Sequence, residues 1–338
     1  MKLNFDKIKE ITLGAERIEQ EDKYIKFYRF TKEEETAYRE RMECFYERSL
    51  FTAGIKLVFK TDSKSLFIKA NIPQLCIRKF FSFDVLVNGE YIGSIDNFSD
   101  KDMSGEYATV ELPIAPCEKG FELGAGEKTV TIYLPYSVIV ELEELIIDDG
   151  AYVEAVKPNK KLLVYGDSIT QGFDILRPSE HHIPRLANSL GTEVFNKAIA
   201  GEVFWSGITM YKAEYVPDYI IVSYGSNDWT SETAESFMKN CSEFFANLKQ
   251  NYPTSKIFVL TPIWRNDTEK ITQLGKFEDV ENSIVNAVGD MDNVMVISGL
   301  DLVPHESKYF GDGALHPNDE GFNLFFENLY FHIKDKLA

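Results

Sequence analysis

Short runs of apolar or alternating residues recur through roughly the first 150 residues, and each is as long as a β-strand. An Asn88-Gly89 pair directly follows one run and precedes Tyr91-Ile92-Gly93, which is a strong hairpin signal. Many short strands at this spacing predict a β-sandwich, of jelly-roll-like type. The charged segment 31–48 does not fit the pattern and is either helical or a long loop. The predicted strands are 55–59, 65–70, 83–87, 107–112 and 129–134.

The pattern changes near the short polar stretch 157–161, after which strand-like runs alternate with amphipathic helical patterns. This alternation predicts a parallel sheet covered by helices on both faces. Thr230 or Ser231 can cap the first of these helices. We therefore predict a β-sandwich domain over residues 1–155 and an α/β domain over residues 156–338. The later strands are 162–165, 192–195, 219–223, 256–260 and 294–297, and the helices are 231–250, 272–288 and 319–336.

Charge and composition narrow the classes of partner. Hydrophobic residues make up 44% and charged residues 27% of the 338 residues, which is ordinary for a globular protein with about two domains. The formal net charge of -18 repels phosphate backbones and anionic membrane surfaces. We expect no nucleic-acid or membrane partner, and a neutral substrate fits more easily. The oligomeric state stays open.

The spacing of the cysteines and the sequence of the N-terminal segment allow predictions about cofactors and about the cellular location of the protein. Cys44, Cys76, Cys117 and Cys241 show no metal-binding spacing, so reduced structural thiols are expected. No His, Cys, Asp or Glu spacing indicates a metal, and no glycine-rich loop fits a phosphate or dinucleotide, so no cofactor is predicted. The N-terminus lacks the apolar core of a secretory signal, and no run approaches the length of a transmembrane helix. We expect a cytoplasmic protein.

Four polar clusters fall where predicted strands end. They are Gly-Asp-Ser-Ile-Thr at 166–170, Asn-Lys-Ala-Ile-Ala-Gly at 196–201, Gly-Ser-Asn-Asp at 225–228, and Gly-Asp-Gly-Ala-Leu-His-Pro-Asn at 311–318. In open α/β sheets, sites lie beyond the carboxyl ends of the strands. We therefore expect side chains from all four clusters to converge at one edge of the sheet.

Together these clusters resemble the SGNH (GDSL-like) hydrolases, a family named for a Ser, a Gly, an Asn and a His in four separated blocks. The resemblance covers about residues 161–338. A Gly-Asp-Ser cluster alone is common by chance, but four blocks in the right order, each near a strand end, are specific. The resemblance implies a flavodoxin-like parallel-sheet domain and a serine esterase.

The resemblance also implies a role for each matching residue. Ser168 matches the nucleophile and His316 the general base that takes its proton and later returns it to the leaving alcohol. The amides of Ser168 and Gly201, with the Asn227 side chain, match an oxyanion hole that stabilises charge in the transition state. A glycine suits this position because its bare Cα lets the amide approach closely.

One departure from the family concerns the acid of the triad. The family usually places an Asp three residues before the His, but position 313 is Gly and the nearest acid is Asp312. A loop can absorb one residue, so we expect Asp312 to orient His316. The alternative is a backbone carbonyl in that role, which would leave a Ser-His dyad.

Several residues admit a simpler interpretation. Ser168 could have only the structural role of capping a helix, and Asn227 could have only that of forming a turn. The Asp167 carboxylate is expected to accept hydrogen bonds from nearby amides. Trp264, Trp205 and Trp229 follow strands or polar clusters and either line a sugar-binding pocket or are ordinary packing aromatics. The pair at 181–182, both histidines, is expected at a helix start on the rim or surface.

A β-sandwich before an SGNH domain resembles bacterial carbohydrate esterases of the acetyl-xylan esterase type. That resemblance implies hydrolysis of O-acetyl esters of sugars, on a small-molecule or oligosaccharide substrate. It leaves the sandwich as a carbohydrate-binding or lid module. The alternatives are a lipase-like or thioesterase-like acyl hydrolase acting on a non-sugar ester, and a catalytically silent carbohydrate-binding protein.

Overall fold

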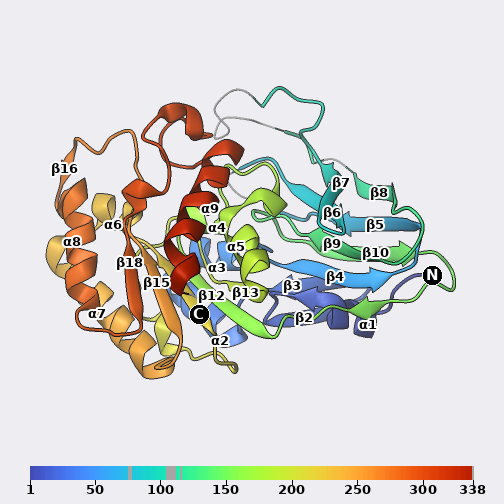
Figure 1. Ribbon diagram of the computed structural model, residues 1–338, viewed down its shortest axis with the longest axis horizontal. Helices are drawn as coiled ribbons and strands as arrows, with labels where there is room; N and C mark the ends of the chain where they lie inside the picture. Colours follow the sequence, from blue (N-terminus) through green and yellow to red (C-terminus); the bar gives the residue numbers. More distant parts are fainter. Residues whose placement is uncertain (75–77, 104–111, 115, 337–338) are drawn as a thin grey trace.

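Antiparallel strands and parallel strands occupy different parts of the computed structural model, which describes residues 1–74, 78–103, 112–114 and 116–336. In Figure 1 the antiparallel strands of the N-terminal half lie to the right, and the parallel sheet with its helices lies to the left. The β-sandwich and parallel-sheet predictions are both confirmed. The predicted strand 107–112 falls almost wholly outside the described residues.

Two antiparallel sheets form the sandwich. The first contains β1 (Thr12–Leu13), β4 (Lys56–Thr61), β6 (Ser82–Val87), β7 (Glu90–Asp96), β9 (Lys128–Tyr133) and β11 (Glu154–Ala155), and the second contains β2 (Arg17–Glu21), β3 (Tyr24–Tyr28), β5 (Ser65–Asn71), β8 (Cys117–Glu122) and β10 (Glu141–Ile147). Their orders are β1-β4-β9-β6-β7, with β11 beside β4, and β2-β3-β10-β5-β8. Alternate side chains of both sheets meet in one buried core, for example Phe59 and Ile132 of the first with Ile68 and Leu145 of the second.

The Asn88-Gly89 signal produces the hairpin that it predicts. Val87 pairs with Glu90, so a two-residue loop joins β6 to β7. Both loop residues have positive φ, 53° at Asn88 and 86° at Gly89. This conformation matches the twist of the flanking strands, and Asn-Gly adopts it at low cost.

The parallel sheet has the order β13-β12-β14-β15-β18. Its strands are β12 (Lys160–Gly166), β13 (Thr192–Asn196), β14 (Tyr219–Ser223), β15 (Lys256–Leu260) and β18 (Val294–Ile297). The chain goes from β12 to one neighbour and then crosses to the other side of β12, so the strand order reverses there. Such a switch point opens a crevice at the carboxyl ends of the strands, where ligands of flavodoxin-like folds bind.

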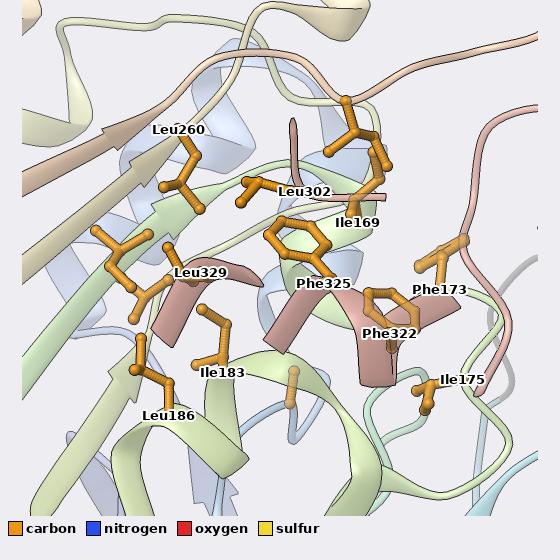
Figure 2. Packing of buried hydrophobic residues seen from close by; sticks show 14 of the residues in the cluster. Ile169, Phe173, Ile175, Ile183, Leu186, Leu260, Leu302, Phe322, Phe325 and Leu329 are labelled. Carbon is orange, nitrogen blue, oxygen red and sulfur yellow. The ribbon is translucent and has the colours of Figure 1, made fainter. Parts of the chain in front are cut away.

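Helices cover both faces of this sheet because successive strand residues point to opposite sides. Leu162 and Val164 face α5 (His182–Leu190) and α9 (Asp319–Ile333), whereas Leu163 and Tyr165 face α7 (Ala234–Asn251) and α8 (Phe277–Val288). Figure 2 shows the first core, in which Phe322, Phe325 and Leu329 of α9 pack near Ile183 and Leu186 of α5. Two short helices, α4 (Ser168–Gln171) and α6 (Ser226–Ser231), follow β12 and β14.

The charged segment 31–48 is helical and covers the parallel sheet, not the sandwich. It forms α2 (Lys32–Arg41) and α3 (Glu43–Ser49), and a further helix, α1 (Phe5–Ile11), precedes the sandwich. A capping box between Thr31 and Glu34 begins α2. Tyr38 and Phe45 enter the core that α7 and α8 share with the sheet. Residues from the first fifty positions therefore help to bury one face of the parallel sheet.

Two predicted helix starts are wrong. The helix expected from 231 begins at Ala234, because Thr233 accepts a hydrogen bond from the Ser236 amide and caps it, and Ser231 ends α6 instead. The helix expected from 272 begins at Phe277, because β16 (Ile271–Thr272) and β17 (Gly275–Lys276) form a small hairpin first. No helix within the described residues is long and apolar enough to cross a membrane.

Candidate active site

Ser168 begins the short helix that follows β12. Asp167 caps this helix by accepting a hydrogen bond from the Ile169 amide at 3.0 Å, as expected, and its carboxyl is buried. Ser168 is therefore not needed as the cap, and its side chain is available for another contact. The last residue of β12 must be glycine, since a Cβ at Gly166 would lie 2.6 Å from the Thr170 side chain.

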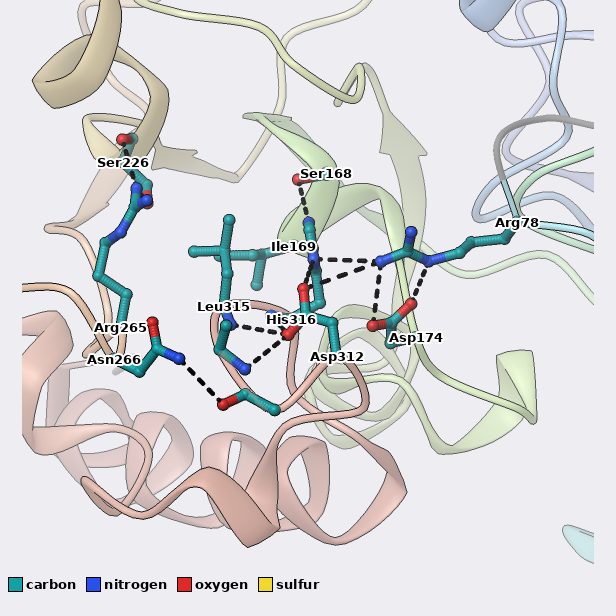
Figure 3. A network of polar contacts seen from close by, with 12 residues as sticks. Arg78, Ser168, Ile169, Asp174, Ser226, Arg265, Asn266, Asp312, Leu315 and His316 are labelled. Atoms are coloured by element: carbon teal, nitrogen blue, oxygen red, sulfur yellow. Dashed lines mark hydrogen bonds and ion pairs between the residues drawn. The ribbon is translucent and has the colours of Figure 1, made fainter. Parts of the chain in front are cut away.

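The structure brings Ser168, His316 and Asp312 together from loops 148 residues apart in sequence (Figure 3). Ser168 Oγ lies 2.8 Å from His316 Nε2, and His316 Nδ1 lies 2.6 Å from Asp312 Oδ2. The second carboxylate oxygen, Oδ1, accepts hydrogen bonds from the amides of Ala314, Leu315 and His316. The tight loop that these bonds close explains how an acid four residues before the histidine still reaches its ring.

Electrostatics fix which nitrogen of His316 faces the serine. Burial alone would raise the pKa of Asp312, but the hydrogen bond and charge of His316, with the loop amides, hold that pKa well below its usual range. Asp312 is therefore a carboxylate at neutral pH and can only accept. His316 Nδ1 must donate to it, which leaves Nε2 of the neutral imidazole free to accept from Ser168.

Gly201 and Asn227 lie at the same edge of the sheet. Strand β12 pairs with β13 on one side and β14 on the other, and the loops after all three strands carry the predicted residues. The Ala200 amide donates to Gln171 Oε1 at 2.8 Å, which ties the Gly201 loop to α4. Asn227 Nδ2 donates to the Glu202 carbonyl at 2.9 Å, which ties the third loop to the second.

Gly201 needs its bare Cα for two reasons. Its φ is +81°, a left-handed conformation that other residues rarely adopt. A Cβ there would also lie 2.9 Å from Arg48 Nη1, and that guanidinium donates to the Ala200 carbonyl. Arg29 is buried and donates to the carbonyls of Asn196 and Ala198 in the same loop. Two arginines from the N-terminal half therefore hold the loop that carries Gly201.

The three tryptophans occupy different environments, and one prediction is wrong. Trp229 is fully buried, donates to the Gly275 carbonyl and packs edge-on against Phe277, so it cannot contact substrate. Helix α6 directs its side chain into the core that α7 and α8 share with the sheet. Trp205 is half-buried against Tyr38 and beneath the Arg41 guanidinium.

Trp264 lines a cavity of about 410 Å³, and its ring stacks on His305 with an interplanar angle of 12°. Lys270, Lys276 and Leu300 also border this cavity. A half-exposed indole beside a hollow of this size can accept a ring-shaped ligand. Neither Ser168 nor His316 is among the residues that line this cavity, so contact between Trp264 and the substrate stays a prediction.

The expected surface position of His181 and His182 is wrong. His181 Nε2 lies 3.0 Å from the Ile169 carbonyl, and His182 is stacked against the rings of Phe322 and Phe325. Burial lowers the pKa of His181 to about 4, so its ring is neutral. Helix α9 covers the start of α5, which the local sequence does not indicate.

Sequence reasoning missed Arg78 and Asp174, which lie beside His316 in Figure 3. Arg78 Nη2 is 3.1 Å from Asp174 Oδ2 and 3.4 Å from His316 Nδ1. No motif marks either residue, because their pairing joins positions 96 apart in the chain. Only the packing of the two halves brings them together.

A comparison with protein-family models matches residues 164–324 to the GDSL-like lipase/acylhydrolase family. These residues belong to that family. The match spans Ser168, Gly201, Asn227, Asp312 and His316, and the enzyme class is carboxylic ester hydrolase. No curated protein matches this chain.

Solved structures resemble the chain across both of its halves. The salicylyl-acyltransferase SsfX3 of a tetracycline biosynthetic pathway is 20% identical with a TM-score of 0.77, covering 96% of this chain and 94% of its own. A GDSL-like lipase from Bacteroides ovatus is 20% identical with a TM-score of 0.74, covering 98% and 96%. A family two carbohydrate esterase from Clostridium thermocellum, in complex with cellohexaose, is 15% identical with a TM-score of 0.64, covering 96% and 99%. At these identities the likeness shows a shared fold.

Proposed function

We propose that this acylhydrolase is a serine esterase that removes O-acetyl groups from carbohydrates through an acyl-enzyme on Ser168. The observation that carries the proposal is the hydrogen-bonded chain from Ser168 Oγ to His316 Nε2, at 2.8 Å, and from His316 Nδ1 to Asp312, at 2.6 Å. In this order a base faces the hydroxyl and a carboxylate stabilises the imidazolium that forms.

The first half of the reaction transfers the acyl group to the enzyme. Ser168 Oγ forms a bond to the acyl carbon while its proton passes to His316 Nε2, and the carbonyl electron pair moves onto the oxygen. The tetrahedral intermediate then collapses, the bond to the sugar oxygen breaks, and that oxygen takes the proton from His316. In the second half, water gives a proton to His316 and attacks the acyl-enzyme, which releases acetate and returns the proton to Ser168.

The negative oxygen of each tetrahedral intermediate needs donors that are already in place. We assign this role to the amides of Ser168 and Gly201 and to the Asn227 side chain. The bonds from Ala200 to Gln171 and from Asn227 to Glu202 support the assignment, since they link the three loops into one rigid edge. Donors held in advance cost no reorganisation when the charge develops.

The proposed substrate, an O-acetyl ester of a sugar, rests on further observations. A net charge of -18 favours a neutral substrate, and Trp264 beside its cavity offers an apolar face to a sugar ring. The family two carbohydrate esterase in complex with cellohexaose shares the fold over 96% of this chain. We assign residues 1–155 to a sandwich domain, of which α2 and α3 pack on the parallel sheet, and residues 156–338 to the catalytic domain, in a cytoplasmic enzyme.

Two assays test the proposal. Hydrolysis of p-nitrophenyl esters is compared across acyl lengths, and loss of acetyl groups from acetylated oligosaccharides is followed by mass spectrometry. We expect preference for acetate, release of acetyl groups from the oligosaccharides, and no turnover by a folded Ser168→Ala variant. A preference for long acyl chains would favour a lipase-like enzyme instead. No turnover of any ester would favour a silent carbohydrate-binding protein.

A further inference from the structure

Arg78 enters the site from the antiparallel half of the chain, between β5 and β6. Its side chain is only 6% exposed. Nε and Nη2 both donate to the Asp174 carboxylate, and Nη2 also lies 3.4 Å from His316 Nδ1 and 3.8 Å from Asp312 Oδ2. A guanidinium carries five N–H donors in a fixed plane and accepts nothing. Arg78 can therefore only support the two carboxylates and cannot take a proton from His316.

Asp174 fixes this guanidinium in place. Its carboxylate is fully buried, in the loop that follows α4, and its backbone has a positive φ of 70°. Both features cost free energy and persist only where the surroundings determine them. The Phe173 ring lies 5.4 Å from the guanidinium carbon of Arg78 and 5.6 Å from the His316 ring. The pair is thus packed against the same imidazole that faces Ser168.

The charges in this cluster depend on one another. One carboxylate oxygen each of Asp174 and Asp312 and a ring nitrogen of His316 all lie within 4.8 Å of one another. Without Arg78, the carboxylates of Asp174 and Asp312 would therefore repel each other. Without Asp174, the charge of Arg78 would oppose the imidazolium that forms during the reaction. Together Arg78 and Asp174 form a neutral pair that keeps Asp312 facing His316. A metal ion at these groups would have to displace a guanidinium that already binds Asp174.

We propose that Arg78 is a positioning residue through which the antiparallel half completes the active site, with Asp174 as its anchor. The proposal rests on the proposed function, because it assigns a purpose to the orientation of His316. It differs from the expectation that the sandwich is only a carbohydrate-binding or lid module. Arg78 approaches Asp312 and the Nδ1 side of the His316 ring, whereas Ser168 lies at Nε2 on the opposite side of that ring.

The test compares Arg78→Ala, Arg78→Lys and Asp174→Asn in the full chain. Arg177→Ala is the matched control, since Arg177 also joins the two halves, 3.7 Å from Asp84, without contacting His316. Three quantities are measured: kcat and KM for p-nitrophenyl acetate, the rate at which a fluorophosphonate probe labels Ser168, and Tm. Guanidinium ion is added to Arg78→Ala as a chemical rescue.

We expect Arg78→Ala to lower kcat and the labelling rate by about 10–100-fold, by analogy with the loss seen when a residue that orients a metal-binding side chain is removed. KM should change little, guanidinium should restore part of the rate, and Arg177→Ala should retain it. Arg78→Lys should be impaired, because a single ammonium cannot hold Asp174 with two bonds and still reach Asp312. A double Arg78→Ala/Asp174→Asn variant should be no slower than Arg78→Ala, since both residues act as one unit.

Different results overturn different claims. A wild-type enzyme that neither hydrolyses esters nor reacts with the probe would contradict the proposed function. If the wild type reacts and Arg78→Lys, folded by its Tm, reacts equally fast, the positioning role is wrong even though the esterase stands. Multiplying effects in the double variant would likewise show that Arg78 and Asp174 act separately. Should Arg78→Ala not fold, Arg78→Lys and Asp174→Asn still decide the question.

Discussion

Replacing Asp312 with asparagine changes one oxygen to an amide nitrogen and keeps the size of the side chain. Oδ1 accepts from the amides of residues 314, 315 and 316 at 2.9, 2.8 and 3.1 Å. An asparagine keeps its oxygen there, because an amide NH₂ facing three N–H donors would lose all three bonds. Its nitrogen must then take the position of Oδ2, 2.6 Å from His316 Nδ1 in the wild type.

A donor at that position forces the wrong tautomer on the histidine. His316 Nδ1 must accept from the introduced amide nitrogen, so the ring proton moves to Nε2, which lies 2.8 Å from Ser168 Oγ. A protonated Nε2 cannot take the serine proton. The same change of tautomer in a Ser-His-Asp protease lowers kcat about 10⁴-fold, so we expect a loss of about 10³–10⁴, or about 4–5.5 kcal/mol of barrier.

The assay is kcat for p-nitrophenyl acetate, with Tm measured on the same samples. Asp312→Asn should have a lower Tm than the wild type at neutral pH, because the stabilised carboxylate is lost, but a higher Tm than Asp312→Ala, because its three loop bonds survive. Asp312→Ala is the matched control: it loses those bonds as well and should be both inactive and less stable. If Asp312→Asn keeps more than about a tenth of the wild-type kcat, against the roughly 10⁴-fold loss for a true triad, His316 is oriented by another group and the site is a Ser-His dyad.

Three further predictions concern the neighbouring loops and pH. Asn227→Ala should lower kcat by about 10²–10³ at similar KM, as for one oxyanion donor, and full activity would refute that role. Gly201→Ala should destabilise the fold by about 1–3 kcal/mol in urea unfolding, from its positive φ and the contact with Arg48; an unchanged midpoint would contradict this. Because the folded-state pKa of Asp312 is lowered, its ionised form stabilises the fold above about pH 4, and this is lost as pH falls further. The stability gap between wild type and Asp312→Asn should therefore narrow below about pH 4, and a gap independent of pH would exclude the effect.

Elements whose signal lies within a few neighbouring residues can be predicted from the sequence alone. Strands 219–223, 256–260 and 294–297 were predicted with the bounds that the structure has, because a buried parallel strand is a continuous apolar run ended by polar residues. The Asn88-Gly89 turn followed from the φ preferences of two residues. Three of the four polar clusters directly follow β12, β13 and β14, and their order with the fourth cluster at 311–318 was enough to predict one site with Ser168 and His316.

Which side chains are covered, and which charges meet, depends on contacts between segments that are far apart in the chain. Trp229 and His182 are predicted at accessible positions by their local sequence, but α8 and α9 pack over them. The pairing of Arg78 with Asp174 joins residues that are 96 positions apart, from two halves with different patterns. The hydrophobic periodicity of a segment predicts which of its faces is buried. It does not predict which distant segment packs against that face. Contacts of that kind depend on how the sheets and helices pack in space.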